Sequence, residues 1–244
     1  MDTEKRCAKI VHWLKEQVRL SGGAGSVFGL SGGIDSSVVA GLCIRAFGQN
    51  CLGVIMPCFS QESDARHGEL AAKAFKLPYV TVSLDDPYRA LLAEMDVKEG
   101  AQNDCNLAIA NIKPRLRMTV LYYYAAMHHY RVIGTGNKSE IYIGYFTKYG
   151  DGGVDLEPLG ELTKGEVRQL AEYLGVPREI INKKPTAGLW EGQTDEDEMG
   201  FSYAELDAFL AGEPVDPEVR ETIERLHNQS HHKRMLPPIY EKKA

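Results

Sequence analysis

Residues 25–37 read Gly-Ser-Val-Phe-Gly-Leu-Ser-Gly-Gly-Ile-Asp-Ser-Ser, an apolar run that passes through two glycines into a helical pattern. The first part, residues 25–31, predicts a buried strand, and residues 34–47 predict a helix that Gly48 ends. Between them, Gly32 and Gly33 allow the backbone to turn tightly and to approach a ligand. Because the free amides at a helix start favour an anion, this stretch predicts a phosphate-binding loop.

Asp35 would repel a phosphate in this loop unless a cation stood between the two, so we interpret it as a magnesium ligand. Ser31 and Ser36 add hydroxyl donors. In the alternative interpretation, Asp35 and Ser36 only satisfy the first amides of the helix. The loop has neither a Gly-Lys-Ser/Thr ending nor the G-x-G-x-x-G spacing, which disfavours P-loop kinases and dinucleotide-binding dehydrogenases.

Around this loop, apolar runs alternate with helical patterns up to about residue 135, which is typical of βα units on a parallel sheet. Further strands are expected at 51–56, 79–84 and 131–135. Helices are expected at 63–75 and 87–95, and a helical pattern reaches about His129 after a polar break over 96–104. The expected fold class is α/β, with a doubly wound, mostly parallel sheet flanked by helices.

The second half of the chain contains capped helices and no further strong strand. Thr163 with Glu166, and Ser202 with Glu205, form capping boxes, in which side chains satisfy the amides of a first turn. Gly175 should end the first of these helices and Pro217 should open the last helix. Residues 183–200 are polar, and the acidic run 195–198 is interpreted as a solvated face without chemistry. We expect one domain over residues 1–244 with a helical C-terminal portion.

Composition narrows the class of protein. With 43% hydrophobic and 25% charged residues, the chain is typical of globular proteins. It contains no secretory apolar core and no 18-residue apolar run, so neither secretion nor membrane spanning is expected. Its five cysteines form no C-x-x-C pair, which predicts reduced thiols and a cytoplasmic location. The net charge of −6 argues against a general nucleic-acid surface.

In its strand-to-helix context, the segment Ser31-Gly32-Gly33-Ile34-Asp35-Ser36-Ser37 resembles the signature loop of the N-type ATP pyrophosphatases, which have the adenine nucleotide alpha hydrolase-like fold. That resemblance implies ATP cleavage to AMP and pyrophosphate through an adenylate. The loop alone does not choose among NAD, GMP and asparagine synthetases and tRNA-modifying enzymes.

Further segments resemble the ammonia-dependent NAD synthetases in order and approximate spacing, over nearly the whole chain. They are Asn-Ile-Lys-Pro-Arg-Leu-Arg-Met at 111–118, Gly-Thr-Gly-Asn-Lys-Ser-Glu at 134–140, Gly-Tyr-Phe-Thr-Lys-Tyr-Gly-Asp at 144–151, Pro-Leu at 158–159 with Leu-Thr-Lys at 162–164, Lys-Pro-Thr-Ala-Gly-Leu-Trp at 184–190 and His-His-Lys-Arg at 231–234.

This resemblance implies a role for each matching residue. The implied ATP contacts are Gly29, Leu30, Ser31, Gly32, Gly33, Ile34, Asp35, Ser36, Thr135, Lys164 and Thr186. The implied contacts to deamido-NAD are Arg115, Lys148, Asp155, His232 and Lys233. Asp35 and Glu140 would hold Mg²⁺, and Asp35 and Lys164 would be catalytic.

The implied enzyme is a carbon–nitrogen ligase, a homodimer that amidates deamido-NAD with ammonia, using ATP as cosubstrate and Mg²⁺ as cofactor. The enzymatic alternative is another pyrophosphatase with this loop, such as a GMP synthetase subunit or a tRNA-thiolating enzyme. The alternative outside enzymes is an adenine-nucleotide-binding module. The second carboxylate, Glu140, favours a ligase, because mere sensing of a nucleotide does not need a site built to expel pyrophosphate.

Overall fold

The computed structural model describes residues 2–95, 97, 107–186, 188 and 194–240. Four strands of this part form one parallel sheet in the order β3-β2-β1-β4. The strands are β1 (Gly25–Gly29), β2 (Cys51–Ile55), β3 (Tyr79–Thr81) and β4 (Tyr130–Val132). The chain runs from β1 to β2 on one side and reaches β4 on the other, so the order reverses at β1. Ligands of open α/β sheets bind beyond the carboxyl ends of the strands at such a switch point.

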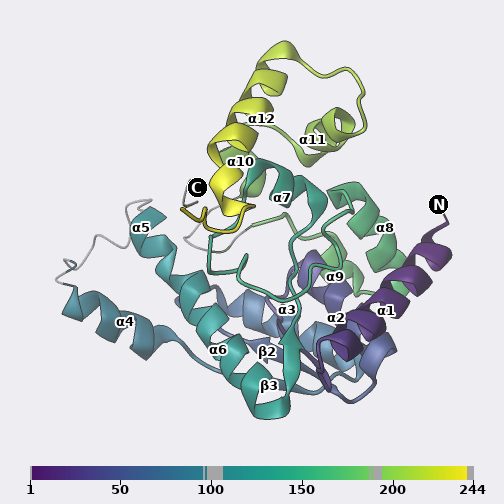
Figure 1. The fold of residues 1–244 in the computed structure, drawn as a ribbon, viewed down its shortest axis with the longest axis vertical. Coiled ribbons are helices and arrows are strands. Elements are labelled where there is room, and N and C mark those ends of the chain that lie inside the picture. The colour runs from purple at the N-terminus through teal and green to yellow at the C-terminus, as the bar shows by residue number, and fades with distance from the viewer. Residues whose placement is uncertain (1, 96, 98–106, 187, 189–193, 241–244) are drawn as a thin grey trace.

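Helices cover both faces of the sheet, as Figure 1 shows. The helices of the first part are α1 (Thr3–Leu20), α2 (Ile34–Phe47), α3 (Glu62–Phe75), α4 (Asp85–Glu94), α5 (Leu107–Ala110) and α6 (Ile112–His128). Those of the second part are α7 (Lys138–Ile143), α8 (Lys164–Leu174), α9 (Arg178–Ile181), α10 (Asp195–Met199), α11 (Tyr203–Leu210), α12 (Pro217–Gln229) and the 3₁₀ turn η1 (His231–Lys233).

Side chains alternate between the two faces of the sheet, and each face packs into its own hydrophobic core. Consecutive side chains of a strand point to opposite faces, and in β1 the neighbours Val27 and Phe28 are both fully buried. Phe28 packs into the cluster formed with α1, α2, α3 and α8. Val27 packs into the cluster formed with α4, α5 and α6. Strands covered on both faces read as continuous apolar runs, which explains the sequence of residues 25–30.

The C-terminal helices have a small core of their own. Met199, Tyr203, Leu206 and Ile223, from α10, α11 and α12, pack with Ile143 of α7. In Figure 1 these helices form a group beyond the sheet, next to α7. This packing fixes α11 against the start of α7, where the candidate site lies.

The predicted fold class is confirmed, and several predicted elements are found with small differences. Helix α2 spans Ile34–Phe47 as predicted, α8 and α11 begin at their predicted caps, and α12 opens with Pro217 as predicted. The helical pattern before His129 is divided into α5 and α6. Strand β3 ends at Thr81 rather than at residue 84, and β4 begins at Tyr130 rather than at residue 131 and ends at Val132. Most of the predicted polar break at 96–104 lies outside the described residues.

In the part of the chain that the structure describes, no helix combines the length and apolar character needed to cross a membrane.

Candidate active site

The loop between β1 and α2 is shaped by serine hydroxyls. The hydroxyls of Ser36 and Ser37 donate to the Gly33 carbonyl at 3.0 and 2.8 Å, and the Gly33 amide donates to Ser31 Oγ at 3.3 Å. Gly33 is the N-cap residue of α2 and has no side chain that could cap the first amides. The start of α2 is therefore available to an anion, as the helix dipole favours.

Gly32 is required in this loop for two reasons. Its φ of +77° lies in the region that favours glycine, and an added Cβ would lie 2.4 Å from the Asp64 carbonyl oxygen. A side chain here would push the loop away from α3, so the glycine sets how closely the loop packs on the fold.

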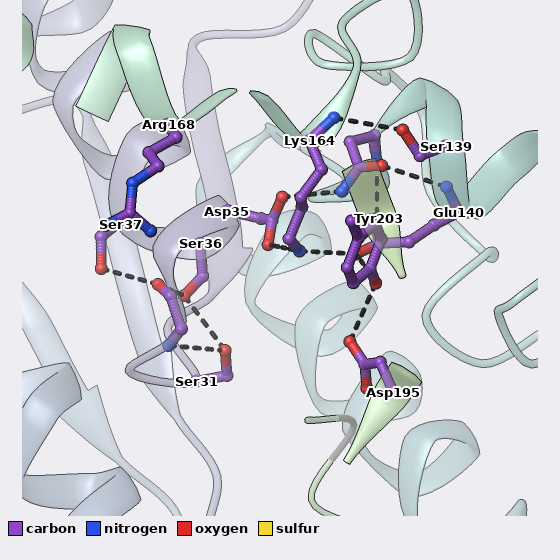
Figure 2. A network of polar contacts seen from close by, with 12 residues as sticks. Ser31, Asp35, Ser36, Ser37, Ser139, Glu140, Lys164, Arg168, Asp195 and Tyr203 are labelled. Atoms are coloured by element: carbon purple, nitrogen blue, oxygen red, sulfur yellow. Dashed lines mark hydrogen bonds and ion pairs between the residues drawn. The ribbon is translucent and has the colours of Figure 1, made fainter. Parts of the chain in front are cut away.

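Asp35, Glu140 and Lys164 meet beside this loop (Figure 2). Lys164 Nζ donates to Asp35 Oδ2 at 2.7 Å and to Glu140 Oε1 at 2.9 Å. The three side chains are only 11–16% exposed, so the Lys164 ammonium balances two carboxylates in a largely dry position. The sequence placed these residues in separate segments, and the structure brings them together.

Neighbouring residues hold this triad in place. Asn137, fully buried, donates from Nδ2 to Asp35 Oδ1 at 2.9 Å and also caps α7. The same cap fixes Glu140 as its third residue, in a capping box. The Lys164 amide donates to Ser139 Oγ at 3.1 Å, which ties α8 to α7. Asn137 was missed as a site residue, although an Asn three residues before a Glu is a recognisable cap pattern.

The electrostatics of the triad follow from burial and from the partners. Burial alone lowers the pKa of Lys164, but the carboxylates of Asp35 and Glu140 outweigh it and raise that pKa above its ordinary value. Burial raises the pKa of Glu140, and the positive charge of Lys164 partly opposes this increase. The lysine is therefore held as a cation at neutral pH, beside the loop between β1 and α2.

The interpretation of residues 195–198 as a solvated face holds for residues 196–198, which are exposed, and is wrong for Asp195. These residues form α10, in which Asp195 is 4% exposed and Met199 is 5% exposed. Residues four apart lie on one helical face, and this face packs inward. Asp195 Oδ2 accepts a hydrogen bond from the Tyr203 hydroxyl at 2.9 Å, and that hydroxyl lies 3.2 Å from Glu140 Oε1. The cap pattern of Thr194 with Asp197 was the signal for this helix.

Tyr203 and Tyr145 both reach Asp195. The Tyr145 hydroxyl lies 3.2 Å from Asp195 Oδ1 and 2.7 Å from Glu198 Oε2. Removing either hydroxyl (Tyr203→Phe or Tyr145→Phe) should lower the free energy of unfolding by about 1–2 kcal/mol. The double variant should lose more than the sum, by about 0.5 kcal/mol or more, because Asp195 then keeps neither hydroxyl donor.

Urea unfolding of the four proteins measures this coupling, with Tyr173→Phe as the control. Tyr173 is 40% exposed, so loss of its hydroxyl should be neutral. Strict additivity would mean that the two tyrosines do not act through Asp195.

A cleft of about 600 Å³ opens at the carboxyl edge of the sheet. Of the sequence-predicted residues, Gly29, Leu30, Ser31, Gly33, Ile34, Asp35, Ser36, Thr135, Glu140, Lys164, Thr186 and Lys233 line it. Gly32 does not line the cleft, because it faces α3. The predicted ATP and magnesium residues are thus gathered around one space.

Most of the residues implied for deamido-NAD lie outside the cleft. Arg115 and His232 are exposed, and the backbone carbonyl of His232 accepts from Lys148 Nζ at 2.7 Å. Asp155 accepts from the Tyr122 hydroxyl and from the Val132 amide, and it lines a separate hollow. Only Lys233 of this group reaches the cleft, where its Nζ donates to the carbonyls of Gly144 and Phe146.

Comparison with known proteins gives a family model, described as NAD synthase, that matches residues 6–237. The NH(3)-dependent NAD(+) synthetase of Carboxydothermus hydrogenoformans is 49% identical over 236 residues, which cover 97% of each chain. That of Archaeoglobus fulgidus is 46% identical over 98% of this chain and 97% of its own.

Two solved structures also match nearly the whole chain. The structure of NMN synthetase from Francisella tularensis has a TM-score of 0.93 and 40% identity, covering 99% of this chain and 100% of that one. The NH3-dependent NAD synthetase from Campylobacter jejuni, solved with a nitrate ion, has a TM-score of 0.82 and 31% identity, with 99% and 100% covered.

Proposed function

Because this chain belongs to the NAD synthase family, we propose that its cleft binds ATP over the loop Ser31–Ser36 and the acid substrate on the side of α6. The function is ammonia-dependent synthesis of NAD, and the enzyme is a carbon–nitrogen ligase. The single observation that carries the assignment of the site is the meeting of Asp35, Glu140 and Lys164 beside the uncapped start of α2.

The loop is proposed to hold the phosphates of ATP. Its free amides, the positive end of α2 and the ammonium of Lys164 all favour negative charge. A lysine ammonium has three donors, and two of those of Lys164 are used by Asp35 and Glu140. Among the described residues no hydrogen bond uses the third donor, and Nζ lies 4.7 Å from the centre of the Tyr203 ring. A phosphate oxygen could accept from this donor, which supports a direct role for Lys164.

Asp35 and Glu140 are the residues that would hold Mg²⁺. Their chemistry fits, since this ion is bound by one or two carboxylates together with substrate phosphates rather than by a cage of protein ligands. Accordingly, the described residues contain no group of three or more His, Cys, Asp or Glu side chains placed for a metal. When bound, the ion would neutralise charge on the phosphates. Asn137 orients Asp35 for this task through its bond to Oδ1.

The proposed reaction has two steps. A carboxylate oxygen of the nicotinate attacks the α-phosphorus of ATP, the bond to the bridging oxygen breaks, and pyrophosphate leaves. Ammonia then attacks the carboxyl carbon of the acyl adenylate, AMP leaves with the bonding electrons, and the nitrogen loses a proton to give the amide. The protein contributes orientation and charge, with Lys164 beside the leaving pyrophosphate.

Incubation of the purified chain with ATP, magnesium, ammonium and deamido-NAD should give equal amounts of NAD and AMP by chromatography. Glutamine in place of ammonium should give no NAD above the blank. ADP as the nucleotide product would rule out adenylation, and efficient synthesis from glutamine alone would rule out free ammonia as the nitrogen source.

The mononucleotide, nicotinic acid mononucleotide, is the second candidate substrate, and the likeness to the Francisella NMN synthetase, with a TM-score of 0.93, favours it. We favour the dinucleotide because the curated relatives that are 44–49% identical are named NAD(+) synthetases. The ratio of kcat/KM for the two acids, measured with one enzyme preparation, decides between them.

A homodimer and a cytoplasmic location are also proposed. Helix α6 exposes Tyr123 and Met127 at 59% and 61%, and exposed aromatic and methionine side chains are enriched where subunits meet. Tyr122, the residue before Tyr123, donates its hydroxyl to Asp155, so a partner on this helix would bring a second chain near a residue implied in substrate binding. The buried cysteines Cys7, Cys43, Cys51 and Cys58 are free thiols, which supports a reducing compartment.

A further inference from the structure

Arg117 is a cation in the wall of the cleft. Its Nε donates to the Met56 carbonyl at 3.1 Å, and its Nη2 donates to Ser60 Oγ at 3.3 Å. Both acceptors follow the last residue of β2, so the side chain is fixed along the carboxyl edge of the sheet. A guanidinium has five N–H donors, so further donors remain beyond these two bonds, and Arg117 lines the cleft.

No carboxylate among the described residues forms an ion pair with Arg117. The acidic side chains that act on it electrostatically are Asp151 and Asp64. Asp64 is paired with Lys183 at 2.6 Å, and Asp151 accepts the Thr147 amide at 2.9 Å. Burial lowers the pKa of Arg117, although an arginine stays charged. A desolvated charge without its own counter-ion is costly, so its presence in a cleft indicates an anionic ligand.

Arg117 and Arg115 have different surroundings, although both belong to the Arg-x-Arg segment. Two residues along a helix turn a side chain by about 200°, so the two arginines point to nearly opposite sides of α6. Arg115 is exposed, with Nε 3.4 Å from the Lys148 carbonyl, and it does not line the cleft. Helix α6 therefore presents Arg117 to the bound substrates.

The place of Arg117 separates it from the ATP phosphates. It is bonded to the residue that follows β2, whereas the phosphate loop follows the neighbouring strand β1. Around it, the cleft wall on the α6 side is formed by Pro114, Met118 and Leu121. Asp64 and Asp151 also line the cleft. An apolar wall with a small number of placed charged groups is typical of a small-molecule site.

We propose that Arg117 binds an oxyanion of the acid substrate and is a specificity-determining residue of the reaction. This inference rests on the proposed function, which assigns the α6 side of the cleft to that substrate. The nicotinate carboxylate and the diphosphate of deamido-NAD offer the same chemistry, two oxygens that match the guanidinium fork.

The test is calorimetric titration of wild type, Arg117→Gln and Arg117→Met with deamido-NAD, NAD and ATP, each alone. Both variants remove the charge, and methionine keeps apolar packing if glutamine harms folding. The dissociation constant for deamido-NAD should rise roughly ten- to a hundredfold, as loss of a charged hydrogen-bonding partner predicts. That for ATP should stay within about twofold, within the scatter of distant substitutions.

NAD distinguishes the two oxyanions, because it lacks the carboxylate and keeps the diphosphate. Unchanged NAD binding assigns Arg117 to the carboxylate, and equal weakening of both dinucleotides assigns it to the phosphates. Arg6→Gln is the matched control, since Arg6 is a buried arginine paired with Glu166 and outside the cleft. This control should lower stability and leave all three affinities unchanged.

Unchanged deamido-NAD affinity in both Arg117 variants would overturn the inference, as would weakening of ATP binding alone. If wild type makes NAD while these affinities are unchanged, only the role of Arg117 is lost. If wild type converts no deamido-NAD, the proposed function itself is wrong.

Discussion

Asparagine in place of Asp35 should reduce pyrophosphate release by roughly a thousandfold or more, the scale of losing a placed charge at a phosphate-transfer site. The substitution keeps the shape of the side chain and removes the charge that faces Lys164. Asp35 does not cap α2, since its carboxylate accepts from Asn137 and Lys164 and the cap residue is Gly33. A loss of rate would therefore not reflect a lost helix cap, and any stability lost with the Asp35–Lys164 pair is read separately from the unfolding midpoint.

The measurement is pyrophosphate release at saturating magnesium, together with the unfolding midpoint in urea. Asp216→Ala is the control, because Asp216 caps α12 by accepting the Glu218 amide at 2.8 Å. Loss of that cap should cost about 1 kcal/mol of stability and leave the rate unchanged. Near-normal pyrophosphate release by Asp35→Asn would show that this carboxylate is not needed for adenylation.

Methionine in place of Lys164 should lower adenylation by roughly a hundredfold, because the charge opposite the leaving pyrophosphate is lost. It should also lower the free energy of unfolding by about 3 kcal/mol, as expected when one partner is removed from a buried ion pair. Asp35 and Glu140 would then face each other without the ammonium that now bridges them.

The change in melting temperature on adding magnesium tests the metal site without measuring catalytic turnover. If the two carboxylates hold the ion, added magnesium should raise the melting temperature of Lys164→Met more than that of wild type, because a cation replaces the missing charge. Lys138→Met serves as the control, since Lys138 forms an exposed pair with Glu161 at 3.6 Å and exposed pairs contribute little. If magnesium raised the melting temperatures of Lys164→Met and wild type equally, this would count against a metal site at Asp35 and Glu140.

The local features of the fold followed from the sequence. The strand, loop and helix of residues 25–47, the caps of α8 and α11 and the Pro217 start of α12 depend on residues a few positions apart. Glycine conformation, capping and apolar periodicity act over such distances, so they can be read from the sequence alone. The same holds for the fold class, because alternating strands and helices permit few arrangements.

The three-dimensional arrangement of the site needed the tertiary structure. Lys164 lies 129 residues from Asp35, and Tyr203 lies 63 residues from Glu140, yet they bond. No local pattern fixes such pairs, since they depend on how α7, α8 and α11 pack around their shared core. That packing also buried Asp195, which as part of an acidic run was interpreted as solvated.

Sequence by itself thus determined the strand, loop and helix of residues 25–47, the capping boxes of α8 and α11, and the α/β class, because each depends on short-range backbone and side-chain preferences. Tertiary structure decided that Asp35, Glu140 and Lys164 lie in contact. It also decided that Arg117, rather than Arg115, faces the cleft. These depend on the rotation and docking of helices, which are set by burial of apolar surface between segments far apart in the chain.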